Sequence, residues 1–348
     1  MKVVIPAADL HKGGGCKALV DIARAMTVRG HDVEIVLPEG SSVHYELPCK
    51  LTVVPALTKS TIPYGDLVLP NYYTTFRPAF EAWPDRCVRI SLGFEPLWSP
   101  ERELALWTYR QDVPVVSISR WLDDRIYEHA RRRSEIVSLG IDPAVFNASG
   151  SNPKRRKGEK PQVILYIARN PDVGYEFKGF RDFQQCMNII KNEWSSPFIV
   201  HLICPERALP LPDIPHRIFF PKSEREMADL YRDADVFVSS SWFEAFSLPP
   251  LEAMACGTPV VTTNSGGVLD YCEHMENAYI TQPKNPRALA EGICALLDDD
   301  LLSDKLIASG LRRASSMTAR HFETRIGETL ETIYLNQIAR KSGKEKRT

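Results

Sequence analysis

The sequence predicts an α/β protein with two successive domains, each built on a parallel β-sheet. Short β-branched runs alternate with amphipathic stretches from the first residue onward, as expected of consecutive βα units. A single polar and basic stretch interrupts this alternation, which then restarts. The length of 348 residues fits such a division, because a typical domain has about 100–200 residues. We therefore expect two doubly wound α/β domains joined by a linker.

The first predicted domain covers residues 1–150. Its clearest helix, Cys16–Arg29, has apolar side chains on one face and a stop signal at Gly30. A second helix is predicted over Arg120–Arg133. The strands predicted from short apolar runs are Lys2–Ile5, Val33–Leu37, Leu51–Val54, Asp66–Leu69, Cys87–Leu92, Pro114–Ser117 and Glu135–Leu139.

The linker is predicted over 151–161, and the second domain over 162–325. Residues 326–348 are expected to form a C-terminal helix, with packing back on the first domain left open, and a basic tail. The second domain's predicted strands are Val163–Ala168, Phe198–Cys204, Arg217–Phe220, Val236–Ser239, Pro259–Thr262 and Ala278–Thr281. Its helices are predicted to begin at Phe180, Ser223 and Pro249, with further helical patterns over Asn285–Leu297 and Leu302–Tyr334.

Composition excludes several classes of protein. The formal net charge of −1 argues against binding to nucleic acid through bulk charge. The 8 cysteines are scattered without any Cys-x-x-Cys, so neither a disulfide framework nor a zinc site is indicated. No run of about 20 apolar residues could cross a bilayer. We therefore expect a soluble, reduced, cytoplasmic chain.

A peripheral position at the inner face of a membrane is left open. Arg125 and Arg131–Arg133 lie on or just after one predicted helix and could contact anionic lipid. A solvated basic face is the favoured interpretation of the same residues. The sequence does not predict the oligomeric state.

The first motif with chemical meaning is KGGGC at 12–16, which follows the first strand and opens a helix. The glycines Gly13, Gly14 and Gly15 allow backbone N–H groups to approach an anion at a helix N-terminus, where the helix dipole favours negative charge. The run matches neither Gly-x-Gly-x-x-Gly nor a Walker loop, so a plain structural turn remains an equal alternative.

The second motif is SSWFEAFSLPPLEAMACGTPVV at 240–261. It predicts a strand end, a turn that carries Glu244, and a helix that begins near Pro249 and carries Glu252 one turn further on. Unpaired N–H groups of Ala245, Phe246, Ser247 and Leu248 would then point from the helix start toward a ligand above the strand ends. The two carboxylates could bind two different hydroxyl-bearing groups.

With these residues the chain resembles the retaining glycosyltransferases of family four (group 1), of the bacterial polysaccharide type. The Glu-x7-Glu spacing from Glu244 to Glu252 is the most specific part of the resemblance, and Gly140-Ile141-Asp142 and Ser265-Gly266-Gly267 also match. The resemblance implies the GT-B fold, in which two Rossmann-like domains face a central cleft. It also implies transfer of a sugar from a nucleotide-diphosphate donor to a hydroxyl acceptor, with retention of anomeric configuration.

The resemblance implies a role for each residue of the motif. Glu252 would hold the ribose hydroxyls, Glu244 would contact the donor sugar, and the amides near Phe246–Leu248 would contact the sugar and the diphosphate. Arg169 and Lys178 would bind the diphosphate, and two cations at a strand's carboxyl end agree with that role because they neutralise a leaving diphosphate without a metal. No cofactor is expected beyond the nucleotide sugar as co-substrate.

Three features depart from the family pattern. The segment Asn170–Phe177 lengthens the spacing between Arg169 and Lys178, and Asp270 stands where the family usually has Glu after its Gly-Gly pair. The stretch 91–98 lacks the histidine that many members place beside the sugar. In that stretch Glu95 could orient an acceptor hydroxyl or could equally be a surface residue. The departing phosphate can itself take the acceptor's proton, so a general base is not required.

Other activities and sites carry less support. Asp233-Ala234-Asp235 has an Asp-x-Asp spacing but precedes its strand, so we do not interpret it as a metal site. A nucleotide-sugar 2-epimerase would need acid and base groups that cannot be assigned, and no Gly-x-Gly-x-x-Gly supports a nicotinamide oxidoreductase. A non-catalytic nucleotide-sugar-binding module also remains open. The donor base, the sugar and the acceptor are not predicted.

Overall fold

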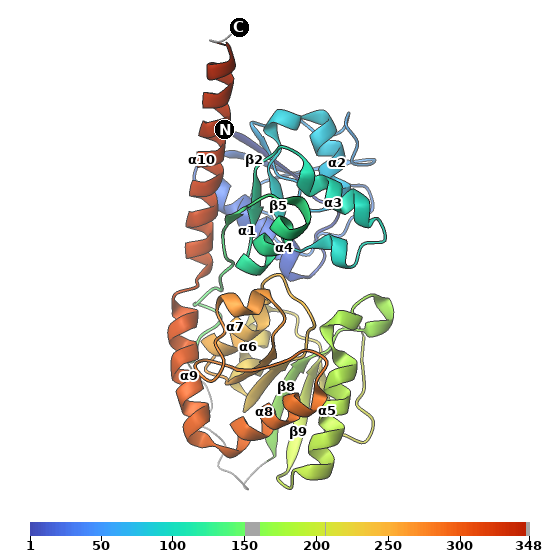
Figure 1. The fold of residues 1–348 in the computed structure, drawn as a ribbon, viewed down its shortest axis with the longest axis vertical. Coiled ribbons are helices and arrows are strands. Elements are labelled where there is room, and N and C mark those ends of the chain that lie inside the picture. Colours follow the sequence, from blue (N-terminus) through green and yellow to red (C-terminus); the bar gives the residue numbers. More distant parts are fainter. Residues whose placement is uncertain (150–160, 206, 346–348) are drawn as a thin grey trace. The chain divides into compact units, whose positions relative to one another are not determined.

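The computed structural model describes residues 1–149, 161–205 and 207–345, with side chains described as far as residue 337. The chain divides into two compact units (Figure 1). Unit 1 contains Met1–Leu139 together with the segment that starts at Ala319, and unit 2 contains Gly140–Thr318. These divisions differ from the domain limits expected at 150 and 325. Nearly all of the predicted linker, 151–161, lies outside the described residues.

Unit 1 is built on a parallel sheet. Its first four strands lie in the order β3-β2-β1-β4, and a second group lies in the order β5-β6-β7. A parallel bridge between Val68 and Cys87 joins the groups, and the Val88 N–H donates to the Val68 carbonyl at 2.9 Å. The strands are β1 (Lys2–Pro6), β2 (Asp32–Pro38), β3 (Lys50–Val54), β4 (Leu67–Val68), β5 (Arg89–Ser91), β6 (Val115–Ser117) and β7 (Glu135–Ile136).

The described helices of unit 1 include two that the sequence did not predict, α2 and α3. The bounds of two predicted helices are also corrected. Helix α1 covers Gly14–Val28, against the predicted Cys16–Arg29. Helix α4 stops at Ala130 and not at Arg133, because Arg131 adopts a left-handed backbone conformation with φ 56°. The helices and 3-10 turns are α1 (Gly14–Val28), α2 (Tyr73–Ala82), η1 (Pro84–Arg86), η2 (Glu95–Leu97), α3 (Arg102–Arg110), α4 (Arg120–Ala130) and α10 (Ala319–Glu345).

Helix α10 is the last helix of the chain and packs on α1 within unit 1 (Figure 1). The Arg29 guanidinium and the His31 ring both bind the Glu331 carboxylate, with Arg29 Nε 2.9 Å and His31 Nε2 2.9 Å from Oε1. The single helical pattern predicted over Leu302–Tyr334 is wrong, because two helices cover this stretch. Helix α9 (Asp300–Ser315) ends before a turn at Ser316, and the chain passes from unit 2 to unit 1 after Thr318.

Unit 2 contains a six-stranded parallel sheet with the order β10-β9-β8-β11-β12-β13. In chain order this is the 3-2-1-4-5-6 arrangement of nucleotide-binding α/β folds, whose order reverses between β8 and β11. Ligands bind such sheets beyond the carboxyl ends of the strands at that point. The strands are β8 (Gln162–Ile167), β9 (Phe198–Ile203), β10 (His216–Phe219), β11 (Val236–Ser239), β12 (Val260–Thr263) and β13 (Tyr279–Thr281).

Helices pack around this sheet and bury its apolar side chains. Ile164, Phe183, Leu202, Val238 and Ile293 are each at most 1% exposed and belong to one continuous core. The helices and 3-10 turns of unit 2 are η3 (Pro171–Val173), η4 (Glu176–Lys178), α5 (Phe180–Glu193), α6 (Glu224–Arg232), α7 (Leu248–Ala255), η5 (Gly267–Asp270), α8 (Pro286–Asp298) and α9 (Asp300–Ser315).

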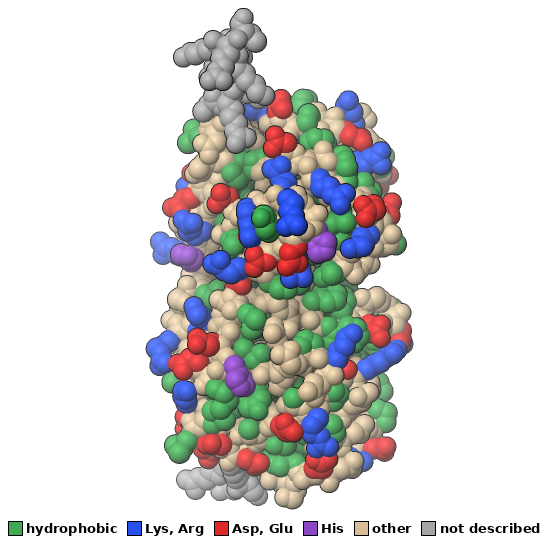
Figure 2. All heavy atoms as spheres, in the orientation of Figure 1, with side chains coloured by type: hydrophobic (Ala, Val, Ile, Leu, Met, Phe, Trp, Pro, Cys, Tyr) green, Lys and Arg blue, Asp and Glu red, His purple; other side chains and the backbone are tan. Residues whose placement is uncertain are grey.

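The surface agrees with the low net charge. On the face drawn in Figure 2, Lys and Arg side chains are interspersed with Asp and Glu. Within the described part of the chain, no helix is both long and apolar enough to cross a membrane.

Candidate functional site

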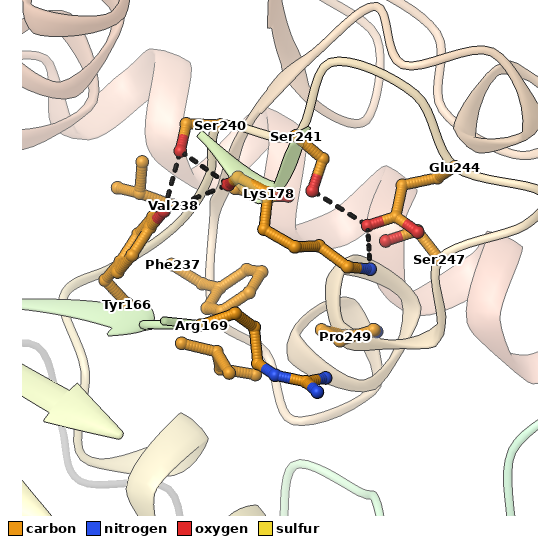
Figure 3. Close-up of a pocket in the computed structure, with 12 residues that line it drawn as sticks. Tyr166, Arg169, Lys178, Phe237, Val238, Ser240, Ser241, Glu244, Ser247 and Pro249 are labelled. Carbon is orange, nitrogen blue, oxygen red and sulfur yellow. Dashed lines mark hydrogen bonds and ion pairs between the residues drawn. The ribbon is translucent and has the colours of Figure 1, made fainter. Parts of the chain in front are cut away.

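A pocket lies where the strand order of unit 2 reverses, at the carboxyl ends of β8 and β11 (Figure 3). This is the place at which open α/β sheets bind ligands. Four of the predicted site residues, Arg169, Lys178, Glu244 and Ser247, line it together. Its lining consists of Tyr166, Ile167, Arg169, Lys178, Phe237, Val238, Ser239, Ser240, Ser241, Glu244, Ser247 and Pro249.

An ion pair occupies one side of this pocket. Lys178 Nζ lies 2.7 Å from Glu244 Oε1, and the Ser241 hydroxyl donates to the same oxygen at 2.8 Å (Figure 3). The Lys178 and Glu244 side chains retain 24% and 14% exposure, so both remain accessible to a ligand. The pair holds the charges in place because each side chain restricts the other.

Close packing of two loops brings these residues together. Gly179 adopts φ 72°, and a Cβ there would lie only 2.0 Å from the Ser240 carbonyl oxygen, so only glycine fits. Two residues further along the second loop, the Trp242 N–H donates to the Phe177 carbonyl at 2.7 Å. The loop after η4 and the loop after β11 are thus fixed against each other, which places Lys178 opposite Glu244.

Arg169 reaches the same pocket despite its longer spacing from Lys178. The intervening segment folds into η3 and η4, and the left-handed Gly174 ends the first of these turns at φ 92°. The Arg169 guanidinium carbon lies 3.7 Å above the centre of the Tyr175 ring. The inserted residues therefore do not separate the two cations.

The start of α7 presents backbone donors. Ser247 precedes the helix in a left-handed conformation with φ 71° and makes no side-chain cap. Among the described residues, the N–H groups of Ala245, Phe246 and Ser247 donate no hydrogen bond. The Phe246 side chain itself is buried. These N–H groups lie at the N-terminus of a helix, where the sequence predicts hydrogen-bond donors for an anionic ligand.

The backbone of Ser265-Gly266-Gly267 makes hydrogen bonds to the loop that carries Glu244. The Glu244 N–H donates to the Ser265 carbonyl at 2.6 Å, and the Gly267 N–H donates to the Glu244 carbonyl at 2.9 Å. A Cβ on Gly267 would lie 2.1 Å from the Ala245 carbonyl oxygen. The glycine is needed because the two backbones approach this closely.

Glu252 lies one turn inside α7 and does not line the pocket. Its Oε2 accepts a hydrogen bond from the Tyr231 hydroxyl of α6 at 2.8 Å. Burial, and then the adjacent carboxylate, raise the pKa of the Tyr231 phenol well above its usual value, so it remains a donor. Sequence reasoning missed Tyr231, because no motif links two residues on separate helices.

The predicted glycine loop is in unit 1, at the start of α1. The Gly13 N–H is already paired, since it donates to the Tyr45 hydroxyl at 2.9 Å. Gly13 is also the N-cap residue of α1, which has no side-chain cap. Of the three glycines, Gly14 and Gly15 remain the candidates for an anion contact.

Glu95 is not the surface residue that the sequence left open. It is 1% exposed, and its carboxylate accepts hydrogen bonds from the buried Arg89 guanidinium and from the Tyr109 hydroxyl, the latter at 2.7 Å. A role in orienting an acceptor hydroxyl would require this buried carboxylate to become accessible. Its present contacts fix the turn η2 that follows β5.

Neither the Asp-x-Asp run nor the basic helix forms a new site. Asp235 Oδ2 accepts from the Val163 N–H at 2.7 Å, at the end of the sheet opposite the pocket. Across the described residues, no group of three or more His, Cys, Asp or Glu side chains could hold a metal ion. Arg133 pairs with Asp123 and Asp124, and Arg125 pairs with Glu128, which fits the solvated basic face.

Comparisons with known proteins agree with the motif and the fold. Residues 213–313 match the family of glycosyl transferases group 1. A D-inositol 3-phosphate glycosyltransferase of Thermobispora bispora is 35% identical over 118 residues, which cover 33% of this chain and 28% of that protein. An N-acetyl-alpha-D-glucosaminyl L-malate synthase of Bacillus anthracis is 30% identical over 238 residues, 66% of this chain and 61% of that protein. The matches thus span less than two thirds of these relatives.

The fold comparison covers nearly the whole chain. The Anabaena protein Alr3699/HepE, solved in complex with UDP and glucose, superposes with a TM-score of 0.77 at 17% identity. That match covers 95% of this chain and 100% of the Anabaena chain. This likeness shows that the chain has the GT-B fold, and residues 213–313 within unit 2 carry its similarity to the glycosyl transferases group 1 family.

Proposed function

We propose that the chain transfers a sugar from a nucleotide-diphosphate donor to a hydroxyl acceptor, with retention of anomeric configuration. The observation that carries this proposal is the Lys178–Glu244 pair, 2.7 Å apart, in a pocket at the reversal point of the unit 2 sheet. A cation and a carboxylate thus lie beside the uncapped start of α7. This combination of groups supports binding of a nucleoside diphosphate sugar, whose phosphates are anionic and whose sugar carries hydroxyl donors.

The diphosphate would be held by Arg169, Lys178 and the amides of Ala245–Leu248. Cations and helix N-terminal amides both favour the charge that develops on the diphosphate as the sugar departs. Gly14 and Gly15 are further candidates for this role, as the family resemblance implies. These contacts act in the transition state more than in the ground state, so they accelerate the reaction and do not merely bind the donor.

The two glutamates would bind different parts of the donor. Glu244 would accept hydrogen bonds from hydroxyls of the donor sugar, since it reaches into the pocket beside Lys178. Glu252 would accept from the ribose hydroxyls, with its carboxylate held by Tyr231. A carboxylate is a strong acceptor for such hydroxyl donors.

The proposed step needs no protein base. The acceptor hydroxyl oxygen attacks the anomeric carbon from the face of the leaving group, and a bond forms there as the bond between that carbon and the phosphate oxygen breaks. The acceptor proton passes to an oxygen of the departing diphosphate. The products are the glycoside, with its configuration retained, and the nucleoside diphosphate.

Relatives support a nucleotide-sugar donor. The Anabaena protein was solved with UDP and glucose. The two relatives named above are, by name, a D-inositol 3-phosphate glycosyltransferase and an N-acetyl-alpha-D-glucosaminyl L-malate synthase. The lining of the pocket favours a transferase over a 2-epimerase, because it contains the single carboxylate Glu244 and no histidine.

A panel of nucleotide sugars tests this proposal. Each is incubated with the protein, with and without a set of sugar and lipid-linked hydroxyl acceptors, in the presence of excess chelator. We expect release of nucleoside diphosphate that depends on the acceptor and survives chelation, and NMR of the product would show retention. Conversion of the donor sugar without release would indicate an epimerase, and binding without either reaction would indicate a binding module. Loss of turnover on chelation, restored by manganese, would contradict metal independence.

A further inference from the structure

The segment Asn170–Phe177 brings an aromatic ring to each cation of the pocket. The Tyr175 ring lies under Arg169, with 3.7 Å between the guanidinium carbon and the ring centre. The Phe177 ring lies near Lys178, whose Nζ is 5.3 Å from the ring centre. Both distances are within the range in which a cation is attracted to the face of an aromatic ring.

These rings are themselves fixed. Phe177 stacks on Phe243 with 4.6 Å between ring centres and 10° between planes, and its carbonyl accepts the Trp242 N–H at 2.7 Å. The Lys178 N–H donates to the Tyr175 carbonyl at 3.0 Å, which closes the turn η4. The rings are therefore part of the folded loop, and each restricts where its cation can lie.

Ring contact and phosphate binding are compatible. A ring under a guanidinium occupies its flat face, whereas the N–H groups lie in the plane and can bind two phosphate oxygens. Without the ring, the long Arg169 side chain would have to lose more rotamer freedom when it binds an anion. A pre-positioned guanidinium avoids part of that cost.

We propose that the segment Asn170–Phe177 is a positioning element, in which Tyr175 orients Arg169 and Phe177 orients Lys178 toward the diphosphate of the donor. The inference rests on the proposed function, because it assigns those two cations to the diphosphate. It also gives a role to the residues that make the spacing between the cations unusual. Tyr175 and Phe177 are positioning residues, since each acts through a neighbouring cation.

The test uses the full-length protein and the conservative variants Tyr175→Phe and Phe177→Tyr, which keep a ring, beside Tyr175→Leu and Phe177→Leu, which remove it. Val173→Ala is the control, because Val173 is 60% exposed in the same segment. UDP, GDP and ADP are titrated calorimetrically, and turnover is measured with the nucleotide sugar that the wild type consumes fastest.

We expect Tyr175→Leu and Phe177→Leu to lower turnover by about 3- to 30-fold, as loss of a cation–ring contact implies. Tyr175→Phe, Phe177→Tyr and Val173→Ala should stay within about twofold of the wild type, with unchanged thermal unfolding. A purely structural role would not distinguish ring-keeping from ring-removing variants at equal stability.

A double-mutant cycle links Tyr175 to its cation. Tyr175→Leu should have no further effect in an Arg169→Met background, because the ring then has no guanidinium to orient. Equal losses in both backgrounds, or wild-type turnover in both Leu variants, would overturn the inference. If the wild type neither binds any of the three nucleotides nor consumes any donor, the proposed function fails instead, which is a separate outcome.

Discussion

The Tyr231 hydroxyl donates a hydrogen bond to Glu252 Oε2 across 2.8 Å, from the last turn of α6 to the second turn of α7. The phenol is fully buried, and its backbone carbonyl accepts the Thr258 hydroxyl at 2.6 Å. Its ring meets Phe237 edge to face, with 5.3 Å between centres. The donor is thus held rigidly, and it restricts the orientation of the carboxylate that we assign to the ribose.

Glu252→Ala should weaken the binding of nucleoside diphosphates without unfolding the protein, because a helix position tolerates alanine. Loss of a charge-assisted hydrogen bond implies roughly 1.5–3 kcal/mol, or about 10-fold or more in affinity. Calorimetric titration of UDP, GDP and ADP provides the measurement. Unchanged affinity for whichever nucleotide the wild type binds would remove Glu252 from the site.

Tyr231→Phe should have a smaller effect on nucleotide affinity than Glu252→Ala, because the carboxylate stays but loses a donor that restricts its orientation. The variant should add little in a Glu252→Gln background. Calorimetric titration of the same nucleotides makes the comparison. An equal loss of affinity in both backgrounds would show that Tyr231 does not act through Glu252.

The buried pair Arg89–Glu95 is expected to matter for the fold of unit 1. Glu95→Leu leaves the fully buried Arg89 uncompensated, which typically costs about 3–5 kcal/mol in the free energy of unfolding. Arg89→Met combined with Glu95→Leu should recover most of that loss, because both desolvated charges are then removed. Urea unfolding of the two variants and the wild type makes the comparison. A double variant as unstable as the single one would contradict this account.

The contact of α10 with α1 should weaken in acid. The Arg29 guanidinium, followed by the His31 hydrogen bond, lowers the pKa of Glu331 from its usual 4.5 to about 2. Because the folded-state pKa is depressed, the stabilisation is complete above about pH 4.5 and is lost as the pH falls toward 2. Solvent screening limits it to about 1 kcal/mol.

The measurement is the difference in unfolding free energy between wild type and Glu331→Gln, which cancels the titration of other carboxylates. It should shrink toward zero as the pH falls from 4.5 to about 2. Glu328→Gln is the comparison variant, since Glu328 forms an exposed pair with Arg325, 3.6 Å apart, and acts on Arg29 through its charge without a hydrogen bond. A difference that stays constant with pH would show that Glu331 makes no such contribution.

The strands and the motif that depend on local sequence patterns could be predicted from the sequence. The short apolar runs predicted β8 and β11, and the Glu-x7-Glu motif placed Glu244 after β11. The position of the pocket could be predicted from these elements, because the carboxyl ends of parallel strands lie at one edge of the sheet. Helix α2 was missed because its start is polar and Pro78 lies within it. The end of α9 was missed because no glycine or proline marks the turn at 316–318.

Contacts between distant residues were beyond sequence reasoning. The sequence left Glu95 either as an acceptor contact or as a surface residue, but its burial is decided by Arg89 on β5 and Tyr109 on α3. The Tyr231 contact to Glu252 joins α6 and α7, and no sequence motif indicates that these two helices pack together. The cation–ring contacts in 169–178 depend likewise on how two 3-10 turns fold back.

The most direct test of the proposed transfer compares Lys178→Ala with Glu244→Ala in two measurements, turnover of donor with acceptor and calorimetric affinity for the sugar-free nucleotide. Lys178 would meet the charge that grows on the diphosphate, so Lys178→Ala should keep measurable nucleotide binding and lose about 10²–10³-fold in turnover. Glu244 would meet the sugar, so Glu244→Ala should spare nucleotide affinity and still abolish most sugar transfer. Equal and small effects of both variants on both quantities would contradict the assignment of this pocket to the donor.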